Sequence, residues 1–221
     1  MTLERIEIET GSPPDGAVIW LHGLGADGHD FEPIVPELGL ADSKLRFVFP
    51  HAPVRPVALN GGMEMRAWYD IDLRAPLSGT EDIRRSAAAV ADLIAELRAA
   101  GIDSRRIVLA GFSQGGVIAL HLGLRHRAPL GGIMALSTYL HDPEHLTDEL
   151  SLENADVPIF MAHGVLDPMI PVTRAITSRE ALLALHYRVE WHEYRMGHSV
   201  CPQEIADISR WLRSRFVPTV R

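Results

Sequence analysis

The sequence predicts an α/β fold in which helices cover both faces of a mostly parallel central sheet. Short, nearly continuous apolar runs alternate along the chain with amphipathic segments of helical period. Such runs are typical of strands that are buried on both faces, and strand–helix alternation is typical of a parallel sheet. Neither a repeat nor a linker interrupts this pattern over the 221 residues, so we expect a single domain spanning residues 1–221.

The central strands are expected at the apolar runs, which fall at 17–21, 46–49, 107–112, 132–136 and 157–162. Residues 3–9 and 187–194 alternate between apolar and polar side chains, which predicts strands with one face in water. Periodic apolar positions predict helices at 81–100, 115–125, 173–186 and 203–216. Residues Ser78–Glu81 have the composition of a capping box for the first helix. Residues 54–79 are rich in glycine and proline and lack a sustained period, which predicts a long functional loop.

Composition and charge narrow the class of protein. Hydrophobic residues make up 47% and charged residues 23% of the chain, as in ordinary globular proteins. The formal net charge of −8 argues against nucleic acid as a partner, because nucleic-acid backbones attract basic patches. The single cysteine, Cys201, rules out an internal disulfide. We see no signal peptide, and no apolar run approaches the roughly 20 residues of a membrane span, so we expect a cytoplasmic protein without stable membrane insertion.

The strongest chemical signal is the segment Gly111–Gly115, whose sequence G-F-S-Q-G fits the pattern G-x-S-x-G. A pattern this short also arises by chance, but here a predicted buried strand precedes it and a predicted helix follows it. In that setting a nucleophilic serine stands on a sharp turn above the sheet, and flanking glycines give the turn the room it needs. The sequence therefore predicts an α/β-hydrolase fold with Ser113 as nucleophile, in preference to a plain glycine-rich turn with a capping serine.

A serine hydroxyl needs a base to take its proton, and in this fold the acid and the histidine follow the nucleophile in that order. Asp167 comes just after the predicted strand at 157–162, at the end where catalytic residues of open α/β sheets lie. His198 follows the next predicted strand in the same way, and Gly197 before it permits a sharp turn. We therefore predict that His198 is the general base and that Asp167 orients it.

Other acids and histidines fit these roles less well. Asp142, Asp148 and Asp156 precede the strand at 157–162 or lie at its start, which is the wrong end. His192 lies inside an alternating strand and is expected to face solvent. His163 ends a strand and is expected to be a hydrogen-bonded structural residue.

Acyl transfer also needs an oxyanion hole, in which two backbone N–H groups bind the oxygen that becomes charged. One donor comes from the residue after the nucleophile, which is Gln114. The second comes from an early loop after a strand, and the loop that contains Gly23 and Gly25 fits that place. We assign the second donor to Leu24, although a plain glycine turn remains an alternative.

No cofactor is expected. The segment His141–His145 is interpreted as a polar surface loop and not as a metal site, and the chain has no Cys/His cluster with metal-ligand spacing. No glycine-rich dinucleotide-binding or phosphate-binding loop follows a predicted strand. Cys201 does not follow a predicted strand in a sharp strand–turn–helix segment, so it is interpreted as a non-catalytic residue near His198.

Taken in order, nine segments of the chain resemble the phospholipase/carboxylesterase family, which includes bacterial carboxylesterases and acyl-protein thioesterases. The resemblance extends from about residue 17 to residue 213, and the ordered set is far more specific than any one motif. The segments are His22–Gly28 (HGLGADG), Pro50–Pro53 (PHAP), Asn60–Met65 (NGGMEM), Trp68–Asp70 (WYD), Gly111–Gly116 (GFSQGG), Pro129–Gly132 (PLGG), Ala135–Tyr139 (ALSTY), His163–Asp167 (HGVLD) and Met196–His198 (MGH).

The resemblance implies an α/β-hydrolase without a separate cap domain. Its substrates would be short- to medium-chain acyl esters, with lysophospholipids or S-acylated proteins as the alternatives. The family's triad falls on Ser113, Asp167 and His198, and its oxyanion donors fall on Leu24 and Gln114. If S-acylated proteins are the substrates, the protein would be an acyl-protein thioesterase.

The resemblance also implies an acyl groove bordered by the loop around Trp68, and a possible homodimer that covers the groove. Met63 and Met65 on the same loop are predicted to line it, although they are equally well explained as packing residues. Relatives usually have proline and serine where this chain has Arg66–Ala67, and often valine at the position of Met169. Both departures lie near the expected groove, so they concern the preferred acyl-chain length and not the chemistry.

Two further functions remain as alternatives. One is a catalytically inactive α/β-hydrolase that binds a ligand, which the complete predicted triad argues against. The other is a hydrolase of a different bond, such as a peptidase or a dienelactone hydrolase. The dienelactone hydrolases usually have a cysteine at the elbow, where this chain has Ser113.

Overall fold

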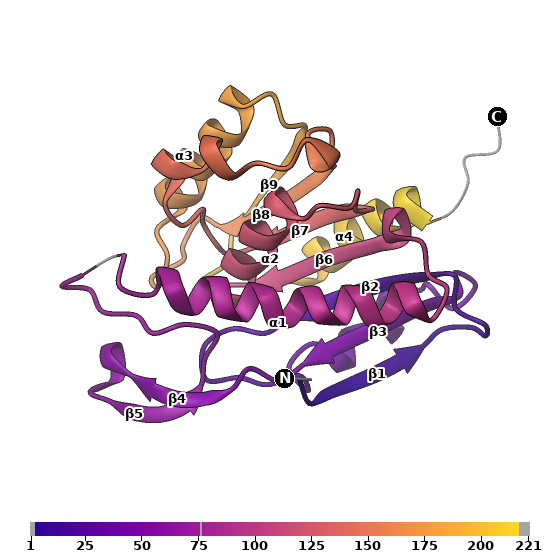
Figure 1. The fold of residues 1–221 in the computed structure, drawn as a ribbon, viewed down its shortest axis with the longest axis horizontal. Coiled ribbons are helices and arrows are strands. Elements are labelled where there is room, and N and C mark those ends of the chain that lie inside the picture. The colour runs from indigo at the N-terminus through magenta and orange to yellow at the C-terminus, as the bar shows by residue number, and fades with distance from the viewer. Residues whose placement is uncertain (1–2, 76, 217–221) are drawn as a thin grey trace.

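Seven strands form the central sheet in the computed structural model, which describes residues 3–75 and 77–216 (Figure 1). In spatial order they are β1 (Arg5–Glu9), β3 (Leu45–Pro50), β2 (Gly16–Leu21), β6 (Ile107–Phe112), β7 (Gly132–Leu136), β8 (Ile159–Gly164) and β9 (Val189–Tyr194). The edge strand β1 pairs antiparallel with β3, and all other neighbours in this sheet are parallel. The predicted mostly parallel sheet is therefore confirmed.

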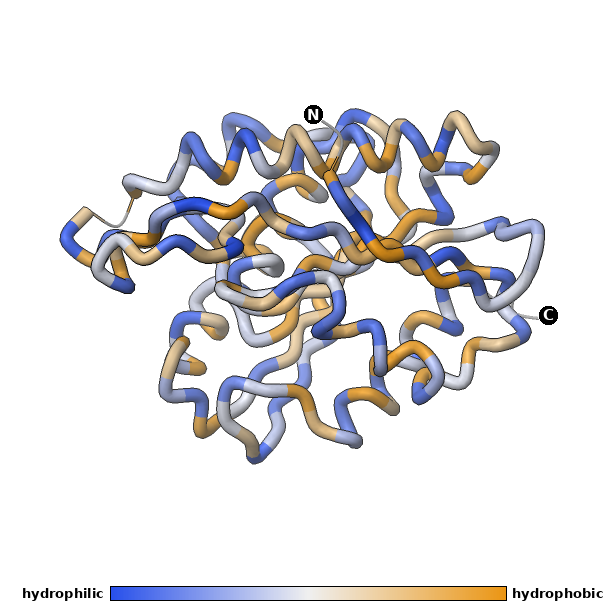
Figure 2. Tube along the Cα trace, turned by 90° about the horizontal axis from the view of Figure 1, so that it is seen from below, coloured by the Kyte–Doolittle hydropathy of each residue, from blue (hydrophilic) through white to orange (hydrophobic). Residues whose placement is uncertain are grey.

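Helices cover both faces of the sheet, as predicted. They are α1 (Thr80–Ala99), α2 (Gln114–Arg125), α3 (Val172–Ala184) and α4 (Pro202–Phe216). The first three pack into one hydrophobic cluster, and α4 packs into another on the opposite face. Alternate residues of β2 divide between the clusters, since Ile19 faces α1–α3 whereas Val18 and Trp20 face α4. Figure 2 shows hydrophobic stretches running through the middle of the molecule between these layers.

The carboxyl ends of the parallel strands bring distant parts of the chain to one edge of the sheet. Strand β6 ends at Phe112 and leads into Ser113, β8 ends at Gly164 just before Asp167, and β9 ends at Tyr194 just before His198. Because β6, β7, β8 and β9 are consecutive neighbours, these three chain segments emerge close together. The topology therefore places the predicted nucleophile, acid and base at the same edge.

The prediction of a long loop at 54–79 is wrong for its first half, where the chain forms a hairpin. Strands β4 (Val54–Val57) and β5 (Met63–Arg66) pair antiparallel in a separate two-stranded sheet. Gly61 and Gly62, which suggested a loop, take φ values of 66° and 83° in the turn between the strands. The strands are too short to produce a visible period in the sequence.

The predicted capping box of the first helix is also wrong. The N-cap of α1 is Gly79, which offers no side chain, whereas Ser78 lies one residue earlier with its N–H bonded to the Ala75 carbonyl. Thr80 Oγ1 instead donates to the Leu77 carbonyl at 2.8 Å. The helix therefore begins without a side-chain cap.

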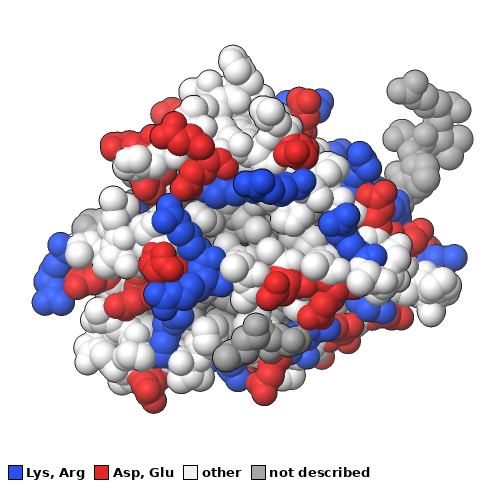
Figure 3. Space-filling model, in the orientation of Figure 1, with Lys and Arg blue, Asp and Glu red and all other residues white. Residues whose placement is uncertain are grey.

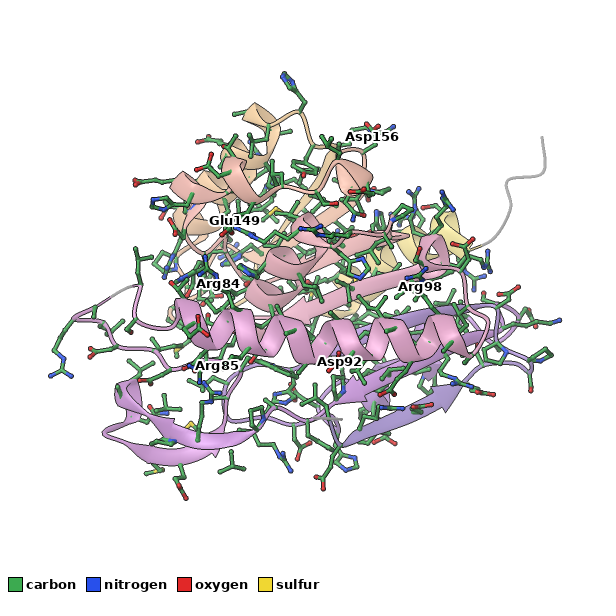
Figure 4. All side chains as sticks on the ribbon, viewed as in Figure 1. Arg84, Arg85, Asp92, Arg98, Glu149 and Asp156 are labelled. Atoms are coloured by element: carbon green, nitrogen blue, oxygen red, sulfur yellow. The ribbon has the colours of Figure 1, made fainter. Side chains whose placement is uncertain are left out.

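Charged side chains of both signs are interspersed over the face in Figure 3. On α1, the exposed Arg84, Arg85, Asp92 and Arg98 project from the helix (Figure 4). Arg84 is paired with Glu149 at 2.9 Å. Basic residues on this face are thus accompanied by acids and do not form a continuous positive surface.

Candidate active site

Ser113 occupies the sharp turn between β6 and α2, with φ 54° and ψ −118°. Positive φ is unfavourable for a residue with a side chain, so the surrounding structure must hold this conformation. The Ser113 N–H donates to the Leu136 carbonyl at 2.9 Å, and Thr138 Oγ1 donates to the Ser113 carbonyl at 2.7 Å. Strand β7 and the residues after it therefore fix the backbone of the predicted nucleophile.

The glycines on both sides of Ser113 are required by close backbone packing. A Cβ on Gly111 would collide with the carbonyl oxygen of Gly115. A Cβ on Gly115 would lie 2.6 Å from the carbonyl oxygen of His22, just after the end of β2. The prediction that this turn needs small neighbours is confirmed, and the first turn of α2 lies directly against the loop that follows β2.

His198 and Asp167 are joined by a hydrogen bond of 2.7 Å between Nδ1 and Oδ2. The other carboxyl oxygen, Oδ1, accepts the N–H groups of Met169 at 2.8 Å and Ile170 at 2.9 Å. The Asp167 side chain is fully buried, whereas that of His198 is 18% exposed. The acid is thus held from both oxygens while the imidazole keeps access to solvent.

The pKa of Asp167 lies below the usual value of an aspartate. Burial alone would raise this pKa, but the hydrogen bonds from the Ile170 N–H and the His198 ring outweigh the effect of burial. The carboxylate is therefore ionised at neutral pH and acts only as an acceptor. As a consequence His198 carries its proton on Nδ1, which leaves Nε2 free to accept the proton of a nucleophile.

The His198 ring lies next to the nucleophile segment, with its centroid 4.7 Å from that of Phe112. In residues 3–75 and 77–216, however, the structure gives Ser113 Oγ no hydrogen bond to this ring. Such bonds are often long in unliganded enzymes and shorten only when substrate is bound. The structure therefore joins His198 to Asp167, whereas the predicted hydrogen bond between Ser113 and His198 is not made among the described residues.

The two rival histidines have main partners other than Asp167, although His163 Nε2 also lies 3.4 Å from Asp167 Oδ2. His192 binds Glu190 at 2.9 Å and stacks on Phe160 with a centroid distance of 4.9 Å, so the expectation that it faces solvent is only partly right. His163 is fully buried and donates from Nε2 to the Ile170 carbonyl at 2.8 Å. Its Nδ1 has no partner among the described residues, so this histidine is only half satisfied.

Leu24 and Gln114 present the two backbone N–H groups predicted for the oxyanion hole. As the first residue of α2, Gln114 has no intrahelical acceptor for its N–H. Leu24 follows Gly23 in the loop after β2, and within the described residues no main-chain acceptor takes its N–H. Both donors are thus available to a ligand, and the one on Gln114 lies at a helix N-terminus, which favours negative charge.

The predicted substrate contacts have different outcomes. Trp68 is fully buried, so the prediction that it borders a groove is wrong in this structure. Met63 and Met169 are exposed at 66% and 67%, which leaves both available to a ligand. The Met65 sulfur lies 3.7 Å from the position that a Cβ on Gly25 would occupy, beside the loop that contains Leu24.

Sequence reasoning gave no role to two buried polar side chains, one directly before the Gly23–Gly25 loop and one in the first turn of α4. His22 accepts the Ala52 N–H on Nε2 at 3.0 Å and donates from Nδ1 to the Gly23 carbonyl at 2.7 Å. Its position directly before the Gly23–Gly25 loop was a sequence signal that His22 could hold this loop in place. Glu204 is fully buried in the first turn of α4, a position where a glutamate is normally exposed, so nothing in the sequence marks it.

Burial dominates the environment of the Glu204 carboxyl. Neither of its oxygens makes a close hydrogen bond among the described residues, and an interaction with the Cys201 main chain offsets the burial only in part. Burial raises its pKa to about 8, and the nearby charge of Asp207 adds to the rise. The folded protein therefore keeps Glu204 protonated at neutral pH, whereas the unfolded chain ionises it above about pH 4.5.

We expect Glu204 to make stability fall as pH rises. Unfolding releases a proton between the unfolded and folded pKa values, so the free energy of unfolding drops by on the order of 1.4 kcal/mol for each pH unit in that window. Glu204→Gln should therefore gain stability over the wild type progressively from about pH 5 to about pH 8, measured by urea unfolding. The exposed Glu37→Gln is the matched control. A Glu204→Gln difference that does not change with pH would contradict this account.

Residues 3–75 and 77–216 contain neither a metal site nor a membrane-spanning helix. No three His, Cys, Asp or Glu side chains are grouped there so as to hold a metal ion. In the segment His141–His145, the ring of His145 pairs with Asp142 at 2.8 Å. No helix in this part of the chain combines the length and the apolar character needed to cross a membrane.

Comparison with known proteins identifies the family of this site. The family model described as Phospholipase/Carboxylesterase matches residues 3–215. The chain belongs to this family. The phospholipase/carboxylesterase family has the α/β-hydrolase fold seen here, and its activity makes the protein a carboxylic ester hydrolase. The family expected from the nine sequence segments is therefore confirmed.

Curated members of the phospholipase/carboxylesterase family include close matches in fungi. Acyl-protein thioesterase 1 of Yarrowia lipolytica is 36% identical over 215 residues, which cover 94% of this chain and 95% of the relative. Acyl-protein thioesterase 1 of Gibberella zeae is 37% identical over 213 residues and 91% of each chain. These alignments span almost the whole protein.

Solved structures of the phospholipase/carboxylesterase fold superpose well on this chain. Acyl-protein thioesterase 2 of Zea mays has a TM-score of 0.86 at 27% identity, covering 96% of this chain and 99% of that one. Esterase PE8 has a TM-score of 0.82 at 28% identity, with 97% and 99% covered. The predicted α/β-hydrolase fold is therefore confirmed along the length of the chain.

Proposed function

We propose that this phospholipase/carboxylesterase family member is a serine carboxylesterase that hydrolyses short- to medium-chain acyl esters through an acyl-enzyme. Ser113 attacks the carbonyl carbon while His198 Nε2 takes its proton, and Asp167 stabilises the imidazolium that forms. The alcohol leaves with the proton from His198. Water, activated by the same imidazole, then releases the acid. The observation that carries the proposal is the 2.7 Å hydrogen bond between His198 and Asp167 beside the strained elbow of Ser113.

The tetrahedral intermediates need a binding site for their negative oxygen. We assign this role to the N–H groups of Leu24 and Gln114, which have no other main-chain acceptor among the described residues. The role is supported by the position of Gln114 at the N-terminus of α2, where the helix dipole favours developing negative charge.

An apolar acyl group is the part of the substrate that the surroundings of the site favour. Three apolar side chains flank Asp167 on one loop and remain in contact with solvent: Val165 is 40%, Leu166 60% and Met169 67% exposed. Met63 on the β4–β5 hairpin is also exposed. Apolar groups left in water near a nucleophile are available to cover an acyl chain.

The second candidate is an acyl-protein thioesterase, which removes acyl groups from cysteine side chains. It is supported by the thioesterase names of the fungal relatives at 36% and 37% identity. The triad serves oxygen esters and thioesters alike, so the two candidates differ in the leaving group and not in the mechanism.

We place the protein in the cytoplasm, where Cys201 stays reduced. We also infer that a homodimer covers the exposed apolar side chains near Asp167.

The test is hydrolysis of p-nitrophenyl esters from acetate to palmitate, alongside an S-acyl thioester of matched chain length. For a carboxylesterase we expect kcat/KM to peak at a short or medium ester and to exceed that for the thioester. A kcat/KM at least about tenfold higher for the thioester would favour the second candidate. No turnover of any substrate would contradict both and favour a ligand-binding protein.

A further inference from the structure

The two proposed oxyanion donors belong to separate parts of the chain, which raises the question of what sets their spacing. Leu24 lies in the loop after β2, whereas Gln114 begins α2. An oxyanion hole works only if both N–H groups lie within hydrogen-bond distance of the same oxygen, and losing one donor costs about 100- to 1000-fold in rate. A small change in the separation of the two segments would therefore reduce catalysis.

Trp68 bonds to both of these segments from a fully buried position. On one side its indole Nε1–H donates to the carbonyl oxygen of His22 at 2.9 Å, two residues before Leu24. On the other side its main-chain N–H donates to the side-chain oxygen of Gln114 at 2.6 Å. One residue thus contacts the loop that carries the first donor and the residue that carries the second.

The Gln114 side chain completes the connection. Its Nε2 donates to the carbonyl oxygen of Tyr69 at 2.7 Å, so the amide bridges consecutive residues of the same segment. The Trp68 carbonyl accepts from Ser86 Oγ on α1, which anchors this segment to a long helix. Gln114 is itself 2% exposed, so these bonds lie in a region without water and are costly to leave unmade.

The loop side of the connection is equally well fixed. His22 is bonded at both ring nitrogens, from the Ala52 N–H on one side and to the Gly23 carbonyl on the other. Its ring packs on the Trp68 indole with a centroid distance of 5.2 Å. Burial lowers the pKa of His22 to about 4, so this bonding pattern is unchanged over the pH range in which an ester hydrolase with a free imidazole base works.

We propose that Trp68 is a positioning residue that holds the Leu24 and Gln114 donors of the oxyanion hole at their working distance. This inference rests on the proposed function. It assigns Trp68 to transition-state stabilisation without any contact between the indole and the substrate. The acyl chain is then bounded by other residues.

Trp68→Phe tests the proposal, because phenylalanine keeps an aromatic ring in the core and removes the N–H that binds the His22 carbonyl. We expect kcat for the best p-nitrophenyl ester to fall by about 10- to 100-fold with little change in KM. Rates are referred to the concentration of sites that a fluorophosphonate labels, so misfolded protein does not count. The inhibition constant of butylboronic acid, whose tetrahedral adduct uses the same hole, should rise by a similar factor.

Four comparisons separate this role from a purely structural one. Trp191→Phe makes the same chemical change on β9, where the indole binds Glu193 at 3.0 Å, and should leave kcat and boronate inhibition unchanged. Gln114→Met removes the other half of the connection while keeping the main-chain donor, and should reproduce the Trp68→Phe result. The double variant should lose little more than either single change, since both break one connection. The pH profile of kcat/KM should stay in place, because His198 and Asp167 are untouched.

The outcomes distinguish the inference from the proposed function. The inference alone is overturned if the wild type is active and both Trp68→Phe and Gln114→Met leave kcat and boronate inhibition unchanged. Additive losses in the double variant, or a kcat loss without any loss of boronate affinity, would also overturn it. If Trp68→Phe fails to fold, Gln114→Met decides by the same two measurements. An inactive wild type would overturn the proposed function and the inference with it.

Discussion

Replacing Asp167 with asparagine is expected to lower kcat by about four orders of magnitude while leaving the fold intact. The asparagine oxygen can keep the two N–H groups of Met169 and Ile170 that Oδ1 now accepts at 2.8 Å and 2.9 Å. The amide nitrogen then takes the place of Oδ2 and points an N–H at His198 Nδ1. His198 Nδ1 must then accept this N–H, so the ring proton moves from Nδ1 to Nε2. An imidazole protonated on Nε2 can no longer take a proton from Ser113.

Steady-state hydrolysis of the best p-nitrophenyl ester measures this effect, and thermal unfolding verifies the fold. Asp142→Asn is the matched control, since Asp142 is the aspartate paired with His145 on the neighbouring loop and should not affect kcat. An Asp167→Asn enzyme that retains more than about one tenth of the wild-type kcat would remove Asp167 from the mechanism. A comparable loss in Asp142→Asn would show that the effect is not specific to Asp167.

Most of the sheet could be predicted because its strands are buried on both faces. The continuous apolar runs at 107–112 and 132–136 became β6 and β7 with the predicted bounds. The elbow at Ser113 was equally predictable, because only glycine fits at Gly111 and Gly115, where a Cβ would meet backbone atoms. The local sequence and the local packing impose the same requirement at these positions.

The role of Trp68 could not be predicted, since the sequence shows a large aromatic residue in an irregular segment and not its environment. Such a residue borders a groove in one fold and fills a core in another. Here the deciding contacts come from His22, Gln114 and Ser86, which are 46, 46 and 18 residues away in the sequence. Long-range contacts of this kind leave no periodic signal. The same holds for the burial of Glu204.

Ser113 is the residue on which the whole account depends. Ser113→Ala removes the attacking oxygen and leaves the His198–Asp167 pair and both oxyanion donors in place. We therefore expect kcat to fall by about six orders of magnitude, to a residual rate about 1000-fold above the uncatalysed reaction that the oxyanion hole still provides. Substrate binding should persist, because the substitution changes neither the exposed apolar side chains nor the backbone donors.

The most direct test is covalent labelling by a fluorophosphonate, followed by mass spectrometry of the digested protein. The account predicts rapid, stoichiometric labelling of the wild type on Ser113 alone, loss of ester hydrolysis in step with labelling, and no labelling of Ser113→Ala. Labelling at another residue, or full ester hydrolysis by Ser113→Ala, would contradict the assignment of Ser113 as the nucleophile.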